Sequence, residues 1–325
     1  MDCKEIISAI ESYPSVALIS HIMPDGDTLG SALALSMHLR AEGKDTALFC
    51  EQPVPLTYRF LHLSEAFRTP DTWDARKETY PLVIAIDCSD LERLGDCRPI
   101  YDGAECTVNI DHHISNERYA AINLVDDSAA AVGEIIYSLI REAGGTVDKP
   151  MAQALYAAVS TDTGNFSYSN TTPATHRIAA ALLECGIDVY TLNNILFRTH
   201  TLERTRLLAL VLSTLEMRRE GTVALLTATD EMMRQSGAGE SETEGMINFA
   251  REIGTVEVGI LFRSRGDGTV KVSFRSKEYV DVSALAQSFG GGGHKRAAGC
   301  TIRGSLAEAK NQVMDRLLPM MEQTH

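Results

Sequence analysis

The chain has 325 residues, of which 44% are hydrophobic and 23% charged, and its formal net charge is −14. This length allows two domains with separate cores, and the composition is typical of a globular protein. The negative charge argues against a protein that coats long nucleic acid or binds long duplexes, because Lys and Arg contacts to phosphates dominate that affinity.

The cysteines and the N-terminal residues predict the compartment. The seven cysteines are odd in number and include no CxxC pair, so we expect reduced and mostly buried thiols. The first residues lack the basic and apolar regions of a signal peptide, and no apolar run approaches the roughly 20 residues that span a bilayer. We therefore predict a cytoplasmic protein without membrane association.

The first part of the chain alternates strand and helix patterns. Short runs rich in Val and Ile predict buried strands at 16–19, 82–86 and 107–110, and a further strand is predicted at 46–49. Helices are predicted at 28–42, 128–142, 151–160 and 174–184. Asp27 or Thr28 is the expected cap of the first helix, whose apolar residues cover two faces and predict burial between other elements. This alternation predicts an α/β domain built on a parallel sheet over residues 1–188.

The second part of the chain has a different texture. An apolar-periodic helix at 200–217 is a candidate bridge between two domains, within a helical linker predicted at 189–220. Strands are predicted at 222–229, 255–263 and 269–275, and helices at 242–251, 282–288 and 305–321. Residues 221–325 are therefore expected to form a smaller α/β domain, with the active site in the cleft between the two domains.

Acidic residues and histidines stand where the predicted strands end. His21, Asp25 and Asp27 follow the strand at 16–19, and Asp87 follows the strand at 82–86. The run Asp111-His112-His113 closes the strand at 107–110, and Asp162 follows an Ala-rich helix. Because open α/β sheets bind ligands at the carboxyl ends of their strands, these side chains are expected to meet at one edge.

Each piece also has an ordinary structural interpretation. Pro24-Asp25-Gly26 is a common turn, Asp27 a common helix cap, and Asp162 a plausible cap for the turn after its helix. Two adjacent histidines are harder to explain by packing, and only one of them is expected to face a given metal. We expect Asp111 to accept the ring N–H of His112 and so to fix its tautomer.

The combination favours a metal centre over these separate explanations. It offers four carboxylates and two imidazoles without a thiolate, which suits Mn²⁺ best and Mg²⁺, Co²⁺ or Fe²⁺ as alternatives. Six ligands are too many for one catalytic metal, but they suit two ions about 3.5–4 Å apart that share a carboxylate, as in phosphoryl hydrolysis. The sequence therefore predicts two divalent metal ions, with Mn²⁺ as the first expectation.

A basic and glycine-rich region lies near the C-terminus. Between Arg263 and Arg303 there are eight Lys or Arg residues against three acids, and the region contains four consecutive glycines at 290–293. The glycines allow backbone N–H groups to approach an anion closely. A small anionic ligand is the favoured interpretation, with a solvated strand face and a flexible linker as the alternatives.

These motifs together resemble a known family. The series His-x-x-Pro-Asp-x-Asp-x-x-Gly-Ser (21–31), Asp87, Asp-His-His (111–113) and Thr-Asp-Thr-Gly (161–164) resembles the four motifs of the DHH phosphoesterases. The run Gly-Gly-Gly-Gly-His-Lys-Arg-Ala-Ala-Gly (290–299) resembles the signature of the DHH-associated domain. The length favours the branch of oligoribonucleases and 3′-phosphoadenosine-5′-phosphate phosphatases over RecJ. The chain also lacks the Ser-Arg-Lys-Lys-Gln-like run of the family II pyrophosphatases.

The resemblance implies roles for individual residues. His21, Asp25 and Asp87 would bind one metal, and Asp27, Asp87, His112 and Asp162 the other, with Asp87 shared. The catalytic set would consist of Asp87, Asp111 and His113, with His113 contacting the scissile phosphate or the leaving oxygen. The implied substrate-binding residues are Arg275, Ser276, Gly292, Gly293, His294 and Arg296.

The expected activity is the hydrolysis of very short RNA to mononucleotides and of 3′-phosphoadenosine 5′-phosphate to AMP. Three alternatives stay open: a phosphodiesterase for cyclic or linear dinucleotides, a hydrolase related to exopolyphosphatases, and a nucleotide-binding regulator without turnover. The intact set of candidate ligands disfavours the regulator. The sequence leaves the cleavage direction undetermined and a homodimer open.

Overall fold

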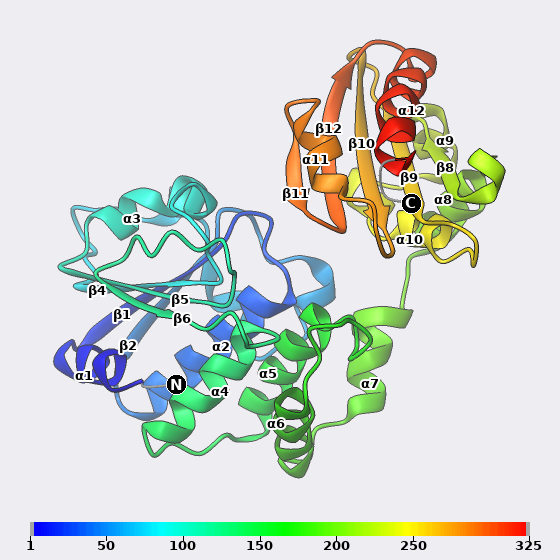
Figure 1. Cartoon of the computed structure of the whole chain (residues 1–325). Coiled ribbons are helices and arrows are strands. Elements are labelled where there is room, and N and C mark those ends of the chain that lie inside the picture. Colours follow the sequence, from blue (N-terminus) through cyan, green and yellow to red (C-terminus); the bar gives the residue numbers. More distant parts are fainter. Residues whose placement is uncertain (1–2, 323–325) are drawn as a thin grey trace. The chain divides into compact units, whose positions relative to one another are not determined.

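Figure 1 shows the computed structural model, which describes residues 3–322 apart from the side chain of His294. The chain divides between Thr199 and His200 into two compact units, unit 1 before this point and unit 2 after it. The segment expected to be a linker, 189–220, is divided between them. Its first helix, α7 (Val189–Asn193), lies in unit 1, and α8 (Leu202–Leu212) lies in unit 2.

Unit 1 is built on sheet A, six parallel strands in the order β3-β2-β1-β4-β5-β6. The strands are β1 (Ser15–Ser20), β2 (Asp45–Phe49), β3 (Phe67–Arg68), β4 (Leu82–Ile86), β5 (Cys106–Asp111) and β6 (Ile122–Val125). The predicted parallel sheet is confirmed, and β3 and β6 add an edge strand on each side. The strand order reverses at β1, which pairs with both β2 and β4. Parallel α/β sheets bind ligands at such a reversal, beyond the carboxyl ends of the strands.

Helices cover both faces of sheet A, as its continuous apolar strands require. Val16 and Leu18 of β1 face a core shared with α1, α2, α4, α5 and part of α6. The alternate residues Ala17 and Ile19 face a second core with α3. In Figure 1, α3 accordingly lies on the opposite side of the sheet from α2 and α4. The helices of unit 1 before α7 are α1 (Lys4–Ser12), α2 (Gly26–Ala41), α3 (Arg98–Asp102), α4 (Val132–Glu142), α5 (Lys149–Asp162) and α6 (Pro173–Glu184).

Helix α2 is buried on nearly all sides, from Gly26 to Leu39, which confirms that its two apolar faces place it between other elements. Its cap differs from the prediction. The carboxylate of Asp25 accepts the backbone N–H groups of Asp27 and Thr28 at 3.0 and 3.2 Å. Asp25 is therefore the N-cap, and Asp27 lies inside the first turn, where its side chain turns toward α4.

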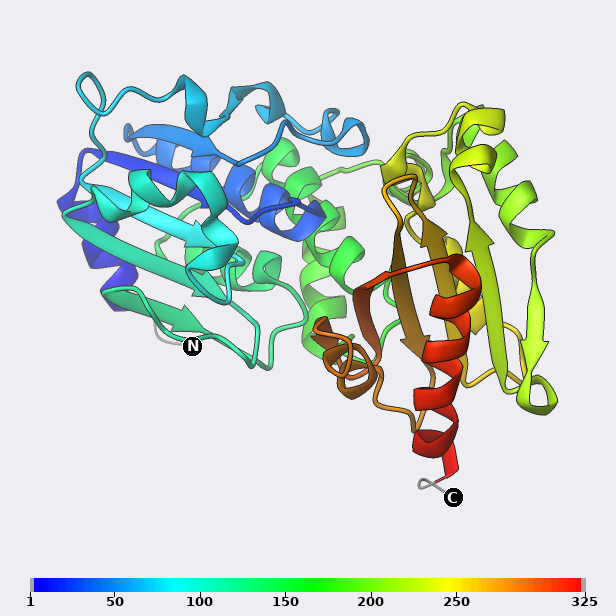
Figure 2. The same cartoon turned by 90° about the horizontal axis from the view of Figure 1, so that it is seen from above.

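Unit 2 contains sheet B, a mixed sheet in the order β11-β12-β10-β9-β8-β7, in which only β8 and β9 pair in parallel. Helices α11 and α12 pack on one face, and α8 and α10 on the other. In Figure 2 the red helix α12 lies along its face of this sheet. The elements are β7 (Glu216–Arg218), β8 (Val223–Ala228), α9 (Asp230–Ser236), α10 (Met246–Arg251), β9 (Val258–Ser264), β10 (Thr269–Ser276), α11 (Val282–Gln287), β11 (Gly292–His294), β12 (Ala297–Arg303) and α12 (Leu306–Glu322).

The predicted helix at 200–217 is shorter than expected, because it ends at Leu212 and the chain then enters β7. Its apolar residues Leu207 and Val211 are buried against sheet B and α10. Helix α8 is therefore part of unit 2 and not a bridge. All seven cysteines are free thiols, as predicted. None of the helices within residues 3–322 has the length and apolarity needed to cross a membrane.

Candidate metal centre

Candidate site residues stand at the carboxyl ends of three neighbouring strands of sheet A. His21 follows β1, Asp87 follows β4, and Asp111 is the last residue of β5. The structure brings the candidate ligand atoms together in overlapping sets within which all atoms lie within 4.8 Å of one another. These sets are His21, Asp25 and Asp87; Asp27, His112 and Asp162; and Asp87, His112 and His113.

His21 is oriented as a metal ligand would be. Its Nδ1 lies 2.7 Å from the carbonyl oxygen of Ile22, so this nitrogen is assigned as the donor. Its Nε2 then carries a lone pair and lies 3.6 Å from Asp25 Oδ1 and 3.4 Å from Asp87 Oδ2. In this tautomer Nε2 is a buried acceptor that faces only other acceptors, and it has no hydrogen-bond partner among the described residues.

Asp87 occupies the middle of the centre. Its Oδ2 faces His21, while its Oδ1 lies 3.7 Å from Nε2 of His112 and 3.4 Å from Nδ1 of His113. The backbone of Asp87 has a φ of 60°, a left-handed conformation that is costly outside glycine and concentrated at functional sites. Its N–H donates to the carbonyl of Ile110 at 2.9 Å, which fixes this conformation against the neighbouring strand.

His112 supplies the second imidazole. Its Nε2 lies 3.9 Å from Asp27 Oδ2 and 3.6 Å from Asp162 Oδ2. Its Nδ1 lies 3.2 Å from the carbonyl oxygen of Ala129, so Nε2 again points its lone pair toward carboxylates. The loop before α4 therefore selects the tautomer of His112.

Asp27 is held by the start of α4. Its two oxygens accept the backbone N–H groups of Val132 and Gly133 at 2.7 and 2.9 Å, and the Ser31 hydroxyl donates to it at 3.1 Å. The carboxylate thus satisfies N–H groups that the first turn of a helix leaves without partners. Asp27 is 1% exposed, so only a cation or a proton can balance its charge.

The pKa values of several candidate ligands are shifted because buried carboxylates lie close together. Burial and the nearby carboxylates of Asp87 and Asp162 raise the pKa of Asp27 well above its ordinary value. Burial likewise raises the pKa of Asp162 to about 6. Although burial lowers the pKa of His21, the neighbouring carboxylates of Asp25 and Asp87 outweigh this and raise it to about 10. The residues thus compete for protons that divalent cations would replace.

These residues fit a metal centre for two reasons. Nε2 of His21 and Oδ1 of Asp87 are buried atoms without hydrogen-bond partners in the described chain, and both point into the cluster. The donors are carboxylates and imidazoles, which suit divalent cations that bind oxygen and nitrogen. The side chains expected to bind each of two metals lie together, and Asp87 contacts both sets.

One predicted contact is wrong. Asp111 Oδ1 lies 2.8 Å from Nδ1 of His113, whereas the ring of His112 turns toward Ala129. Asp111 receives only the backbone N–H of His112, at 2.8 Å. The reason is the alternation of side chains, because His113, two residues beyond Asp111, returns to the same side. Although burial lowers the pKa of His113, its hydrogen bond with Asp111 raises it overall.

The amide residues behind Asp111 were not predicted from the sequence. Asn116 donates to Asp111 Oδ2 at 2.5 Å and to Asn109 Oδ1 at 2.8 Å. Asn109, inside β5, donates to the Cys88 carbonyl at 3.1 Å. A fully buried Asn in the middle of an apolar strand was the available signal, because such a side chain needs partners.

The candidate substrate residues of unit 2 gather around one end of the β10–β12 pair. Arg275 stands opposite Ala297, and Gly293 stands opposite Ala298. The φ of Gly293 is 141°, and a Cβ there would lie 2.5 Å from the Ala297 carbonyl oxygen, so this position requires glycine. Gly292, by contrast, has open space around its missing side chain. The predicted role of the His294 side chain lies outside the described residues.

Some of these side chains already have structural partners. The Ser276 hydroxyl is buried and donates to the Val280 carbonyl at 2.7 Å. The Arg296 guanidinium donates to the carbonyls of Val280, at 2.8 Å, and Glu278. Arg275 donates to its neighbour, the Phe274 carbonyl, at 3.0 Å. Within this set, the side chains of Ser276 and Arg296 are used to build the turn at 276–281.

Comparison with known proteins identifies both parts of the chain. The model of the DHH family, N-terminal domain, matches residues 15–159, and that of the DHHA1 domain matches residues 221–323. The bifunctional oligoribonuclease and PAP phosphatase NrnA of Thermus thermophilus is 33% identical over 316 residues, covering 96% of this chain and 91% of the relative. The protein of the same name from Bacillus subtilis is 29% identical, covering 92% of each chain.

Solved structures support the same fold. An exopolyphosphatase-related protein from Bacteroides fragilis superposes with a TM-score of 0.92 at 24% identity, covering 98% of this chain and 96% of that one. RecJ from Thermus thermophilus superposes with a TM-score of 0.54 at 16% identity, covering 97% of this chain and 54% of that one. At these identities the likeness concerns the fold alone. The matched motifs and the full-length similarity to NrnA proteins show that the chain belongs to the DHH family and joins a DHH domain to a DHHA1 domain.

Proposed function

We propose that this protein is a metal-dependent phosphoesterase that cleaves very short oligoribonucleotides to mononucleotides and converts 3′-phosphoadenosine 5′-phosphate to AMP. The observation that carries the proposal is Asp87, whose two oxygens face His21 on one side and His112 on the other. The similarity to NrnA proteins over nearly the whole chain supports the choice of substrates.

The proposed cofactor is a pair of divalent ions, with Mn²⁺ as the first candidate and Mg²⁺ or Co²⁺ as alternatives. His21, Asp25 and Asp87 would hold one ion, and Asp27, Asp87, His112 and Asp162 the other. Bound there, the ions would polarise the phosphoryl group and lower the pKa of a water molecule. The chain itself holds His21 and His112 in the tautomers that present Nε2 to the ions.

His113 is the proposed partner of the scissile phosphate or the leaving oxygen. Asp111 orients its ring through Nδ1, and Asn116 in turn holds Asp111. A carboxylate on one ring nitrogen favours the protonated imidazole, which can donate to an anionic oxygen. Arg275, Gly292, Gly293 and His294 are proposed to bind the substrate's terminal phosphate. Arg296 and Ser276 are proposed to shape that site through the turn they hold.

A substrate panel tests the activity. Purified protein with Mn²⁺ is given a diribonucleotide, 3′-phosphoadenosine 5′-phosphate, a cyclic dinucleotide and polyphosphate, and mononucleotides and orthophosphate are measured separately. We expect mononucleotides from the first substrate and AMP with orthophosphate from the second. The Asp87→Asn variant controls for contaminating enzymes. Preferred turnover of the cyclic dinucleotide or of polyphosphate would replace the proposal by that activity, and no turnover of any substrate would reject it.

The proposal includes discrimination against long nucleic acid. A diribonucleotide should be cleaved faster than a 20-mer of the same composition. Both substrates offer a terminus that can be bound, but the negatively charged protein repels the long phosphate backbone of the 20-mer. Time courses at equal concentrations of ends would test this. Equal or faster processive cleavage of the 20-mer would contradict it.

We further propose a cytoplasmic location. Light scattering of the purified protein would show whether it forms a homodimer.

A further inference from the structure

Arg93 is a basic residue beside the candidate metal centre that the proposed mechanism does not use. It lies in η4 (Glu92–Cys97), the 3-10 helix that follows β4 and Asp87. Its side chain is partly buried, and Nε is fully shielded from solvent without a hydrogen-bond partner among the described residues. A buried donor without an acceptor is destabilising, so this position favours an anion that accepts a hydrogen bond from Nε.

Backbone contacts place Arg93 next to the loop that carries a candidate ligand. The N–H of Ile22, the residue after His21, donates to the Arg93 carbonyl at 2.8 Å. The N–H of Arg93 donates to Asp90 Oδ1 at 3.0 Å. These contacts use only backbone atoms of Arg93, so its guanidinium is not needed to build the turn.

The guanidinium of Arg93 has a donor left for a ligand. Its Nε is buried without an acceptor among the described residues, in the short helix that follows Asp87 in the chain. An anion that arrives with the substrate can supply that acceptor.

We propose that Arg93 is a substrate-binding residue whose guanidinium grips a phosphate oxygen beside the metal centre. The inference rests on the proposed function for the identity of the phosphate, which is the one held for cleavage. Arg suits this role because its planar, permanently charged donors match phosphate oxygens. Unit 1 would then contain a phosphate contact of its own, in addition to those proposed in unit 2.

The test measures binding of inorganic orthophosphate to the Mn²⁺-loaded full chain by calorimetry. Arg93→Gln should weaken orthophosphate binding by roughly 10- to 150-fold, the loss expected for one charge-assisted contact, and Arg93→Lys by less. Metal content after dialysis should not change. The matched control is Arg98→Gln in the adjacent helix α3, where Arg98 is exposed and pairs with Asp102 at 3.1 Å. This variant should bind orthophosphate as the parent does.

The outcomes separate the two proposals. Unchanged orthophosphate binding in Arg93→Gln would overturn the role of Arg93, and so would loss of bound metal, which would make Arg93 a support of the metal centre. An equal loss in the Lys and Gln variants would overturn it too, since it would indicate a packing role. If the parent chain hydrolysed no phosphoester but still bound orthophosphate through Arg93, the proposed function would fail while this inference would stand.

Discussion

Asp87 combines three properties in one residue: a strained backbone, a buried carboxylate and contact with both candidate ligand sets. Asn and Asp tolerate the left-handed conformation better than most residues. Asp87→Asn therefore removes the charge while keeping the backbone conformation, which makes it a sharper test than Asp87→Ala.

We predict that Asp87→Asn lowers turnover of a diribonucleotide by about 1,000-fold or more, because two cations would lose their shared anionic ligand, a loss of several kcal/mol. Bound metal should fall from two ions per chain toward one or none, as measured by elemental analysis after dialysis. When a chelator has removed the metal, the unfolding temperature of the variant should be no lower than that of the parent, because the variant has one uncompensated buried charge fewer. Near-parental turnover with two ions bound would end the shared-ligand interpretation.

At this scale the sequence predicted which side chains assemble, because carboxyl ends of parallel strands share one edge whatever the details of the loops. It failed on the partner of Asp111. The choice between His112 and His113 depends on the path of three backbone residues and on Ala129, which lies 18 residues beyond Asp111. Arg93 was missed for a similar reason, because only the folded structure shows that its Nε lacks a partner.

At the scale of elements, the centre depends on how closely α2 and α5 approach. Helix α2 carries Asp27 in its first turn, and α5 ends on Asp162. At the crossing, a Cβ on Gly30 would lie 2.3 Å from the Ala154 carbonyl oxygen and 3.2 Å from the Ala158 Cβ. The two helices can therefore bring their carboxylates together only while residue 30 has no side chain.

Gly30→Ala should reverse the usual effect of this substitution in a helix. An Ala in a helix is normally about 1 kcal/mol better than Gly, but here overpacking should destabilise unit 1 by about 1–3 kcal/mol. Trp73, the only Trp in the chain, lies in unit 1, so its fluorescence during urea unfolding reports on that unit. Mn²⁺ affinity should fall as well, because the helices carrying Asp27 and Asp162 are forced apart.

The control is Gly103→Ala, also in unit 1, where the nearest atom to a new Cβ would be 3.4 Å away, an ordinary contact. It should change neither property appreciably. If Gly30→Ala were as stable as this control and bound Mn²⁺ equally well, the close crossing would not be what brings the candidate ligands together.

The sequence predicted that α2 is buried on two faces, but it did not predict this crossing. The periodicity of apolar residues shows which faces of a helix are buried and does not identify the helix that packs against them.

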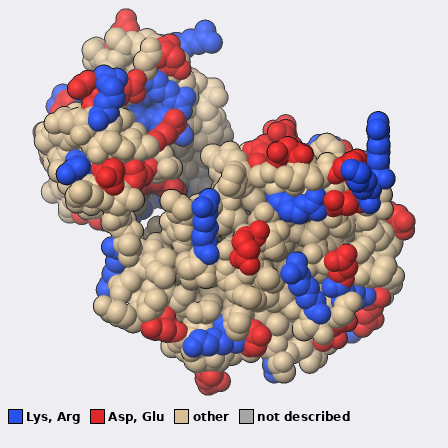
Figure 3. Space-filling view, turned by 180° about the vertical axis from the view of Figure 1, so that it is seen from behind, with Lys and Arg blue, Asp and Glu red and all other residues tan. Residues whose placement is uncertain are grey.

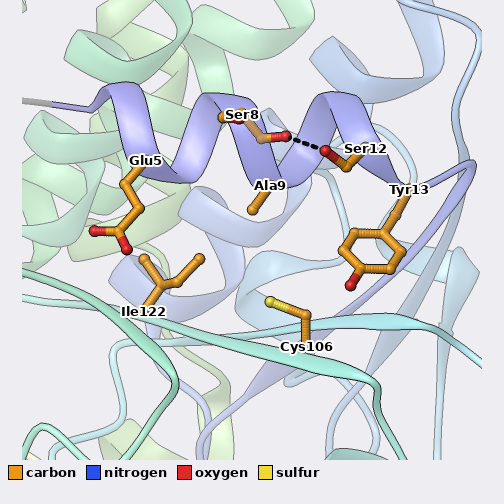
Figure 4. Close-up of a pocket in the computed structure, with 7 residues that line it drawn as sticks. All are labelled: Glu5, Ser8, Ala9, Ser12, Tyr13, Cys106 and Ile122. Carbon is orange, nitrogen blue, oxygen red and sulfur yellow. Dashed lines mark hydrogen bonds between the residues drawn. The ribbon is translucent and has the colours of Figure 1, made fainter.

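The pocket in Figure 4 is separate from the candidate metal centre. It lies between α1 and sheet A and is lined by Glu5, Ser8, Ala9, Ser12, Tyr13, Cys106 and Ile122. Cys106 and Ile122 are the first residues of β5 and β6, so this pocket is at the amino ends of the strands. The candidate ligands follow the carboxyl ends, at the opposite edge of the sheet.

At the scale of the whole molecule, charge is less concentrated than the sequence suggested. The face drawn in Figure 3 shows basic and acidic side chains interspersed. Within the basic region, Arg263 and Arg265 both pair with Glu240, and Lys277 donates to the Ile253 carbonyl at 2.6 Å. Several charges counted as available for an anion therefore have partners within unit 2. A count along the sequence cannot reveal this, because Glu240 lies more than 20 residues away from the arginines it neutralises.

The two units should separate chemistry from recognition, and Arg275 tests this division. The candidate metal ligands all lie in unit 1, whereas Arg275 lies near the end of β10 in unit 2. A charge-assisted contact to a phosphate typically contributes about 1.5–3 kcal/mol. Arg275→Ala should therefore lower kcat/KM for a diribonucleotide by roughly 10- to 150-fold, at about 1.4 kcal/mol per tenfold. Hydrolysis of bis(p-nitrophenyl) phosphate should change little, because that diester has no terminal phosphate to bind.

The matched control for this prediction is Arg303→Ala. Arg303 is exposed and stands opposite Thr269, at the other end of the β10–β12 pair from Arg275 and Ala297. It has the same charge on the same sheet, so general loss of positive charge would affect both variants alike. An effect confined to Arg275 and to the diribonucleotide would support a specific phosphate contact in unit 2. An equal loss on both substrates would place Arg275 in the catalytic centre or in folding, because a residue that only anchors the far phosphate cannot alter the cleavage of a substrate that lacks one.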